Sequence, residues 1–184
     1  KEFLQNAGGI VPWTWWPHDE VGHTDEAKKE CNLLFEADVS FGTPKPERLI
    51  ERILTIGSNP GDVVLDSFLG SGTAAAVAHK MGRRWIGIEL GEHAVTHCVP
   101  RLKKVVDGEQ GGISQAVGWR GGGGFRFCRL GPPIFDESDH INPGKLESHR
   151  TTLFERNLVC WRQGTLRSRD WPVTNYLFRD NLLW

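Results

Sequence analysis

A short apolar run, two closely spaced glycines and an alanine-rich run, residues 64–78 (VLDSFLGSGTAAAVA), constrain the fold of this chain most strongly. Residues 63–68 have the apolar, β-branched composition of a buried parallel strand. The alanine-rich stretch from Thr73 to Met81 predicts a helix that Gly82 closes, and residues 83–89 (RRWIGIE) predict a second buried strand. This order predicts a βαβ unit with a right-handed crossover and two adjacent parallel strands.

The turn between the first strand and the helix suits a nucleotide-type ligand. Gly70 and Gly72 lack the β-carbons that would keep a ligand away from the turn. The helix that begins at Thr73 points free N–H groups and a partial positive charge toward the same space. Glu89, at the end of the second strand, is placed to accept hydrogen bonds from ribose hydroxyls. Together these residues predict a nucleoside pocket rather than a sharp turn beside a solvated carboxylate.

A dinucleotide is an alternative ligand, because residues 70–75 (GSGTAA) fit the pattern G-x-G-x-x-A. Against it, Asp66 and residues 67–69 separate the strand from the first glycine, whereas a dinucleotide turn usually begins directly after its strand. An NAD-dependent oxidoreductase therefore stays open as a second alternative.

The rest of the chain divides into four regions. Residues 1–43 contain a tryptophan cluster and a helix capped by Thr24, and residues 44–110 hold the βαβ unit between a helix that starts near Pro46 and one that Pro100 kinks or interrupts. Residues 111–149 begin with a glycine-rich loop, followed by strand-like alternation at 125–130. The last region, residues 150–184, has little periodicity and no assigned structure.

Composition indicates a soluble globular protein, since 39% of the 184 residues are hydrophobic, 24% are charged and the net charge is −1. Nucleic acid is permitted as a partner but not indicated by charge. No apolar run is long enough to cross a membrane, and we expect a cytoplasmic location. We expect no metal site, because the four cysteines are widely spaced and three histidines fit helix surfaces better than a metal cluster. These histidines are His79, His93 and His97.

Several ordered motifs give the chain a specific resemblance. Residues 66–73 (DSFLGSGT) and 43–49 (TPKPERL) resemble S-adenosylmethionine-dependent DNA amino-methyltransferases. Residues 14–30 and 121–131 narrow the likeness to modification subunits of type III restriction systems. The resemblance covers roughly Gly9 to Asp136. It implies an α/β, Rossmann-like S-adenosylmethionine-dependent methyltransferase fold, present here as a partial, C-terminal half with a parallel sheet and flanking helices.

The same resemblance implies a set of residues that bind S-adenosylmethionine. One group flanks the methionine end of the cofactor, a second surrounds its methionine and adenosyl parts, and a carboxylate binds the ribose. The first group is Thr43, Pro44, Lys45 and Pro46; the second is Asp66, Phe68, Gly70, Ser71, Gly72 and Thr73; the carboxylate is Glu89.

The chain departs from the family in one respect that bears on catalysis. Such enzymes resemble one another in a tetrapeptide, Asp or Asn followed by Pro-Pro-Tyr or Pro-Pro-Phe, which orients the target amine and stacks on a flipped base. The Pro-Pro pair in Gly131 to Ile134 lacks both the acceptor and the ring. No catalytic residue is therefore assigned, and we expect this chain to be the C-terminal half of a larger enzyme and inactive alone.

The predicted function is thus the cofactor-binding portion of a DNA methyltransferase, with adenine N6 preferred over cytosine N4 by the resemblance alone. Its expected partners are DNA, the missing N-terminal half that carries catalysis and recognition, and possible further modification and restriction subunits. The alternative, which is a binding protein rather than an enzyme, is a catalytically silent cofactor-binding or assembly module.

Aromatic and basic residues in the tail admit two interpretations. They suit phosphate and stacking contacts with nucleic acid, or a solvated surface with one or two tryptophans packed inward. The residues concerned are Trp161, Arg162, Arg167, Arg169 and Trp171.

Overall fold

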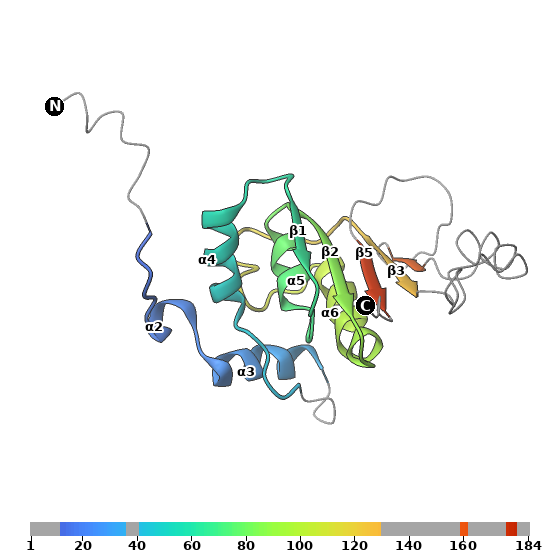
Figure 1. Ribbon diagram of the computed structural model, residues 1–184, viewed down its shortest axis with the longest axis horizontal. Helices are drawn as coiled ribbons and strands as arrows, with labels where there is room; N and C mark the ends of the chain where they lie inside the picture. The colour runs from blue at the N-terminus through green and yellow to red at the C-terminus, as the bar shows by residue number, and fades with distance from the viewer. Residues whose placement is uncertain (1–11, 36–40, 130–158, 162–175, 180–184) are drawn as a thin grey trace, which may run out of the picture.

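The computed structural model describes residues 12–35, 41–129, 159–161 and 176–179, which build a layer of helices against a five-stranded sheet (Figure 1). The strand order is β1-β2-β5-β3-β4. Strands β1, β2, β5 and β3 run parallel to one another, and β4 runs antiparallel to β3. The strands are β1 (Val63–Asp66), β2 (Arg84–Glu89), β3 (Phe125–Arg129), β4 (Val159–Trp161) and β5 (Tyr176–Arg179).

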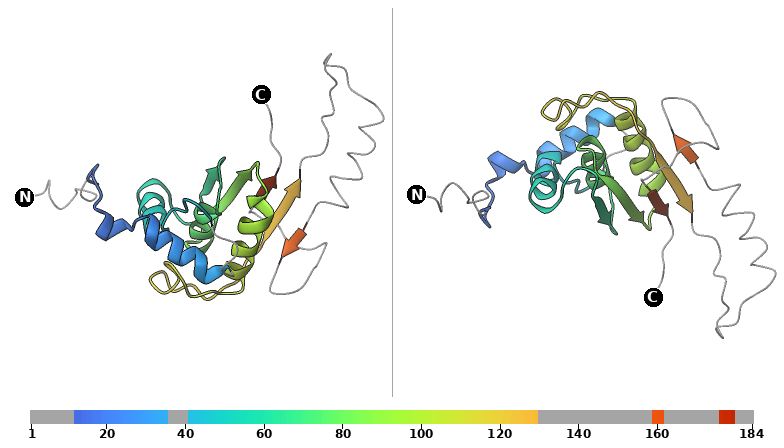
Figure 2. Two further views of the ribbon diagram at one scale, coloured as in Figure 1. Left: turned by 90° about the horizontal axis from the view of Figure 1, so that it is seen from below. Right: turned by 90° about the horizontal axis from the view of Figure 1, so that it is seen from above.

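The helices gather on one side of the sheet. Both views of Figure 2 place α4, α5 and α6 on the same side of β1 and β2. On the other side of β1, Val63 and Leu65 are exposed, while Val64 between them packs against the core. The helices are α2 (His18–Val21), α3 (Thr24–Leu34), α4 (Glu47–Gly57), α5 (Thr73–Lys80), the π-helix η1 (Ala94–Cys98) and α6 (Val99–Val106).

The predicted helix, strand, helix, strand, helix order between residues 47 and 107 is confirmed. The two strands of the βαβ unit are adjacent and parallel, with Val63 opposite Arg84 and Asp66 opposite Gly87. The intervening helix α5 ends at Lys80, one residue short of the prediction, and Gly82 follows with a φ of 72°. Residues 111–124 contain neither helix nor strand, and 125–129 form the expected strand β3.

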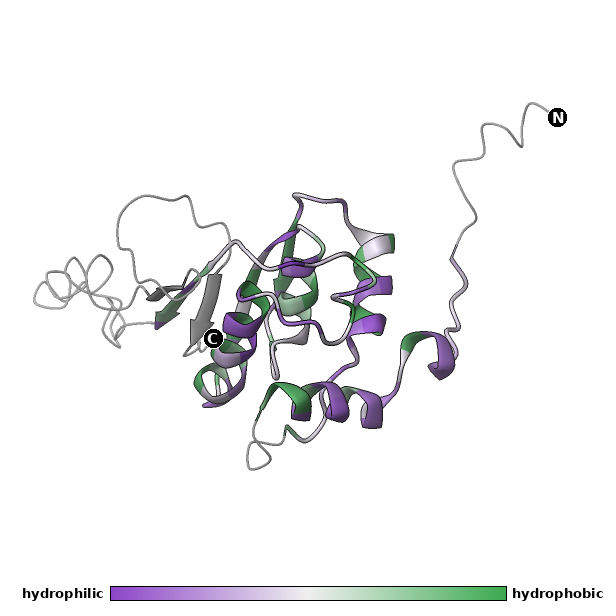
Figure 3. Cartoon of the chain, turned by 180° about the vertical axis from the view of Figure 1, so that it is seen from behind, coloured by the Kyte–Doolittle hydropathy of each residue, from purple (hydrophilic) through white to green (hydrophobic). Residues whose placement is uncertain are grey.

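Small side chains let α5 lie close to the sheet and to its neighbouring helices. Residues 75–78 of α5 are all buried and belong to one core with Trp85, Leu102 and Phe125. The alanine side chains of α5 occupy little volume, so the aromatic rings of Trp85 and Phe125 from the strands fill the remaining space. By contrast, α3 and α4 carry hydrophilic residues along their outward sides (Figure 3).

The expected cap of α3 was wrong. The N-cap of α3 is His23, whose Nδ1 accepts from the Glu26 amide at 3.2 Å, and Thr24 is already helical. The predicted helix of residues 92–106 is divided into the π-helical turn η1 and α6, and Pro100 lies in the first turn of α6, directly after this change of helix type. The missing N–H of proline costs the least free energy at this position, because the first N–H groups of an α-helix have no partner within it.

The predicted surface position of the histidines holds for His93 alone. His79 and His97 are both buried, because nearly all of α5 and the inner face of η1 are covered by other elements. A histidine ring is largely apolar and can be buried in a covered helix when its ring nitrogens have hydrogen-bond partners.

The tail contributes two strands that the sequence did not reveal. Strand β5 lies between β2 and β3, and β4 pairs with β3 at the edge. Trp161 belongs to β4. The other tail residues considered for nucleic-acid contact, Arg162, Arg167, Arg169 and Trp171, lie outside the described residues, as does the Pro-Pro pair of residues 131–134.

Candidate cofactor site

The glycine turn crosses the carboxyl ends of β1 and β2. The Leu69 amide donates to the carbonyl of Ile88 at 2.9 Å, and the Gly72 amide donates to the carbonyl of Leu69 at 2.9 Å. Gly87 makes room for this crossing, since a β-carbon there would lie 2.6 Å from Cδ2 of Leu69. The turn is therefore fastened to the second strand, and residues far apart in sequence meet at the strand ends.

Glu89 is directly bonded to the turn. Its Oε2 accepts from the Gly70 amide at 2.7 Å and its Oε1 accepts from the Gly91 amide at 2.9 Å. An ionised carboxylate has about four acceptor positions, so each oxygen keeps one for a further donor. The structure thus brings together the two features, glycine turn and terminal carboxylate, on which the nucleoside prediction was based.

Glycine is required at positions 70 and 72 for a different physical reason from the one expected. Gly70 and Gly72 have φ values of 55° and 83°, in the left-handed region that favours glycine. A β-carbon on Gly72 would lie 3.3 Å from Cα of Cys98, and one on Gly70 would lie 3.2 Å from Cζ of Phe41. The space that these β-carbons would fill is occupied by the protein itself rather than left for a ligand.

Cys98 supports the underside of the turn. Its buried Sγ donates to the carbonyl of Gly70 at 3.1 Å. Burial, together with the nearby carboxylates of Glu89 and Asp66, raises the pKa of this thiol to about 12. The thiol is therefore neutral at physiological pH and acts as a hydrogen-bond donor and packing group.

The hydroxyl groups of the turn face the interior. Ser71 and Thr73 are buried, and their hydroxyl oxygens lie 3.1 Å apart. Helix α5 begins at Thr73 with Gly72 as its N-cap, and no side chain caps it. The groups that remain for a ligand at this turn are consequently the backbone N–H groups of Ser71 and Thr73, at the positive end of a helix dipole, because the amides of Gly70 and Gly72 already donate within the protein.

Asp66 and Phe68 shape the approach to the turn. Oδ1 of Asp66, the last residue of β1, accepts from the Phe68 amide at 3.0 Å. Phe68 is 91% exposed. An aromatic ring so exposed beside a bonded carboxylate suits stacking against a planar ligand or a partner surface.

The lead-in segment of residues 43–46 alternates between exposed and buried side chains. Thr43 and Lys45 are exposed, whereas Pro44 and Pro46 are buried. Glu47 then begins α4, and its amide donates to Oε2 of Glu30 at 3.1 Å. The segment therefore has fixed prolines and two polar side chains that face outward.

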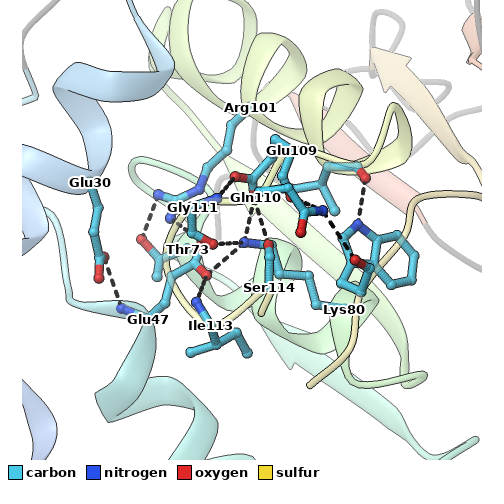
Figure 4. Close-up of polar contacts among 12 residues, drawn as sticks. Glu30, Glu47, Thr73, Lys80, Arg101, Glu109, Gln110, Gly111, Ile113 and Ser114 are labelled. Carbon is cyan, nitrogen blue, oxygen red and sulfur yellow. Dashed lines mark hydrogen bonds and ion pairs between the residues drawn. The ribbon is translucent and has the colours of Figure 1, made fainter. Parts of the chain in front are cut away.

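A buried charge network, which sequence reasoning missed, lies between α4, α5 and α6 (Figure 4). Glu47 accepts from Arg101 at 2.9 Å and from Lys80 at 2.7 Å, and Lys80 also pairs with Glu109. Burial opposes ionisation of Glu47, but the charges and hydrogen bonds of Arg101 and Lys80 outweigh it and lower its pKa. A sequence signal that could have found it was Lys80 at the end of an alanine-rich helix.

Aromatic rings form a cluster at the other side of the turn. Phe41 lies edge-on to His93 and His97, with ring centroids 5.1 and 5.3 Å away, and the two histidine rings are 5.5 Å apart. Phe41 also lies against Gly70, so this cluster connects the chain just before the lead-in segment to the turn by apolar contact.

Two further observations concern the described residues as a set. Within the ranges given above, no three histidine, cysteine or carboxylate side chains are grouped as they would be around a metal ion. Nor is any helix in those ranges both long and apolar enough to cross a membrane.

Comparison with known proteins places this site in a family. A family model described as DNA methylase matches residues 5–99, more than half of the chain. The chain is 59% identical over 88 residues to the protein named "Probable type III restriction-modification enzyme HindVI Mod subunit" of Haemophilus influenzae, a match that spans 48% of this chain and 12% of that relative.

It is also 57% identical over 95 residues to the "Type II methyltransferase M1.MboII" of Moraxella bovis, covering 52% of this chain and 35% of that relative. The chain thus spans well under half the length of either curated relative. The glycine turn, Glu89 and the lead-in segment all fall within the residues matched by the family model. The chain belongs to the DNA methylase family.

Proposed function

We propose that this chain is the cofactor-binding portion of a DNA amino-methyltransferase that uses S-adenosylmethionine. The observation that carries the proposal is the bond between Glu89 and Gly70 beside the uncapped start of α5. A carboxylate with free acceptor positions suits ribose hydroxyls, and unbonded helix N–H groups suit a carboxylate such as that of the methionine part. Family membership supports this ligand over a dinucleotide.

The proposed roles follow the positions of the side chains. Glu89 holds the ribose, and Asp66 and Phe68 border the methionine and adenosyl parts. Gly70, Ser71, Gly72 and Thr73 line the cofactor with their backbone, since the two hydroxyls face inward. The N–H groups proposed to bind it are those of Ser71 and Thr73, because the amides of Gly70 and Gly72 already donate to Glu89 and to the carbonyl of Leu69. Residues Thr43 to Pro46 flank the methionine end.

The proposed reaction is attack by an exocyclic amine of a DNA base on the methyl carbon of S-adenosylmethionine, with S-adenosylhomocysteine as the leaving group. We favour adenine N6 over cytosine N4, because one relative is named as a type III Mod subunit. The sequence contains no acceptor beside a Pro-Pro-aromatic motif, so these groups come from another part of the enzyme.

The outward side of the sheet supports that proposal of a missing half. Parallel sheets are normally covered on both faces, yet Val63 and Leu65 of the edge strand β1 are 49% and 61% exposed. We propose that an N-terminal half covers them, and that DNA, a second modification subunit and a restriction subunit are further partners of the whole enzyme.

Titration calorimetry tests the ligand. We expect S-adenosylmethionine and S-adenosylhomocysteine to bind the chain and NAD to give no heat of binding at the same concentrations. Tight NAD binding would favour the oxidoreductase alternative. If neither S-adenosylmethionine nor S-adenosylhomocysteine binds the folded chain, the proposed function is wrong.

A further inference from the structure

Arg101 of α6 connects two segments that lie far apart in the sequence. Its side chain is fully buried between α4 and the glycine turn (Figure 4). Nη2 donates to Oε1 of Glu47 at 2.9 Å, and Nη1 donates to Oγ1 of Thr73 at 2.9 Å. Nη1 also reaches the carbonyl of Ser71 at 3.5 Å. One guanidinium therefore bonds the first residue of α4 and the first residue of α5.

Both ends of this bridge adjoin proposed cofactor-binding segments. Glu47 directly follows Thr43 to Pro46, and Thr73 directly follows Gly72. A guanidinium presents its donors in a rigid planar fork, so two partners bonded to one fork have a fixed separation and orientation. The bridge consequently fixes the lead-in segment relative to the turn.

Fold stability alone is a weak reason for this arrangement. Removing two charges from water costs free energy that their attraction only partly offsets, and apolar residues of similar volume often replace such pairs without loss. Arg101 also places a positive charge at the positive end of the α5 dipole, which is unfavourable. Its Nε has no hydrogen-bond partner within the part of the chain that the structure describes.

We propose that Arg101 is a positioning residue of the cofactor site, which holds the lead-in segment and the glycine turn at the separation that the methionine end of the cofactor requires. The proposal rests on the proposed function. Glu47 serves as the anchor of the bridge, since Lys80 and the Ile113 amide hold its other oxygen at 2.7 and 3.1 Å.

Lys80 provides a matched control for this role. Like Arg101 it is fully buried and paired with Glu47, but its other partners are Glu109 and the carbonyl of Gly111 rather than the turn. Removal of either cation leaves Glu47 without one of its two charged partners. Only removal of Arg101 also releases Thr73.

The experiment measures the Kd of S-adenosylhomocysteine by calorimetry for the whole chain and for Arg101→Met, Arg101→Lys and Lys80→Met, at a temperature where near-UV circular dichroism shows each folded. We expect Arg101→Met to raise Kd about tenfold or more and Arg101→Lys to recover part of the loss. Lys80→Met is expected to change Kd by less than about threefold.

Equal weakening by Arg101→Met and Lys80→Met, or no change in Arg101→Met, would overturn the proposal. Should Arg101→Met fail to fold, Arg101→Lys is compared with Lys80→Arg under the same criterion. If the wild-type chain binds no S-adenosylhomocysteine, the proposed function fails, and amide hydrogen exchange of residues 71–75 then tests the bridge. Faster exchange in the Arg101 variant than in the Lys80 variant supports it; equal exchange overturns it.

Discussion

At the scale of single residues, Glu89 is the side chain with the most direct proposed contact to the cofactor. Replacement of Glu89 by alanine removes the acceptor proposed for ribose and also the acceptor of the Gly70 amide. We expect binding of S-adenosylhomocysteine to weaken by about 1 to 3 kcal/mol, the usual cost of losing hydrogen bonds to a charged group.

Calorimetry on Glu89→Ala measures this loss, with Asp25→Ala as a control because Asp25 is an exposed carboxylate on α3. An unchanged affinity in Glu89→Ala would remove Glu89 from the proposed site.

His79 gives the fold a pH dependence of known sign. Burial lowers its pKa below the usual 6.5, and the neutral ring accepts from Nε1 of Trp85 at Nδ1 and donates to the carbonyl of Gly122 from Nε2. The unfolded chain binds this proton at a higher pH than the folded chain does. The free energy of unfolding therefore falls as the pH drops below about 6.5, by at most about 1.4 kcal/mol per pH unit from this one group.

Urea denaturation between pH 7.5 and 5 measures this dependence. His79→Gln, which is neutral at every pH, is expected to show a smaller slope than the wild type over the same range. Parallel slopes for the two proteins would contradict the assignment.

At the scale of elements, the close approach of η1 to the glycine turn yields a comparison between two glycines. Gly72 and Gly82 have similar φ values of 83° and 72°, but a β-carbon on Gly72 meets Cys98 whereas one on Gly82 meets nothing within 4 Å. Alanine at either position costs about 1 to 3 kcal/mol of folding free energy, because its backbone must adopt the left-handed conformation. Gly72→Ala must in addition push η1 away.

We therefore expect Gly72→Ala to lower the free energy of unfolding by more than Gly82→Ala does, in urea denaturation under one set of conditions. Equal losses would mean that η1 yields to the added methyl group without cost.

The elements also differ in how far the sequence predicts them. The unit β1–α5–β2 is local, so hydrophobic pattern and turn residues determine it, and the parallel pairing of its two strands followed from the βαβ order. Strand β5 inserts between β2 and β3 from more than 45 residues further along the chain than β3, and nothing in its own four residues specifies that neighbour. Likewise, the sequence placed Glu89 beside Gly70, but no local pattern pairs Arg101 with both Glu47 and Thr73.

At the scale of the whole molecule, a cofactor-binding portion without an amine acceptor is expected to be idle. Orientation of the attacking group contributes several kcal/mol to such reactions, of order ~7 in favourable cases. We expect the purified chain to transfer no labelled methyl group to mixed-sequence DNA, and to do so once an N-terminal half with the Pro-Pro-aromatic motif is supplied. Methyl transfer by the chain alone would mean that the described residues or the tail contain an acceptor of another kind.

The contact between Gly112 and Glu47 has a consequence for how this family varies. A β-carbon on Gly112 would lie only 2.1 Å from Oε2 of Glu47, and its φ of 52° disfavours any other residue. A side chain at position 112 is therefore compatible only with a shorter residue at position 47, and a glutamate at 47 only with glycine at 112. Across related chains these two positions, 65 residues apart in sequence, should change together, and frequent side chains at 112 in chains that keep the glutamate would contradict this coupling.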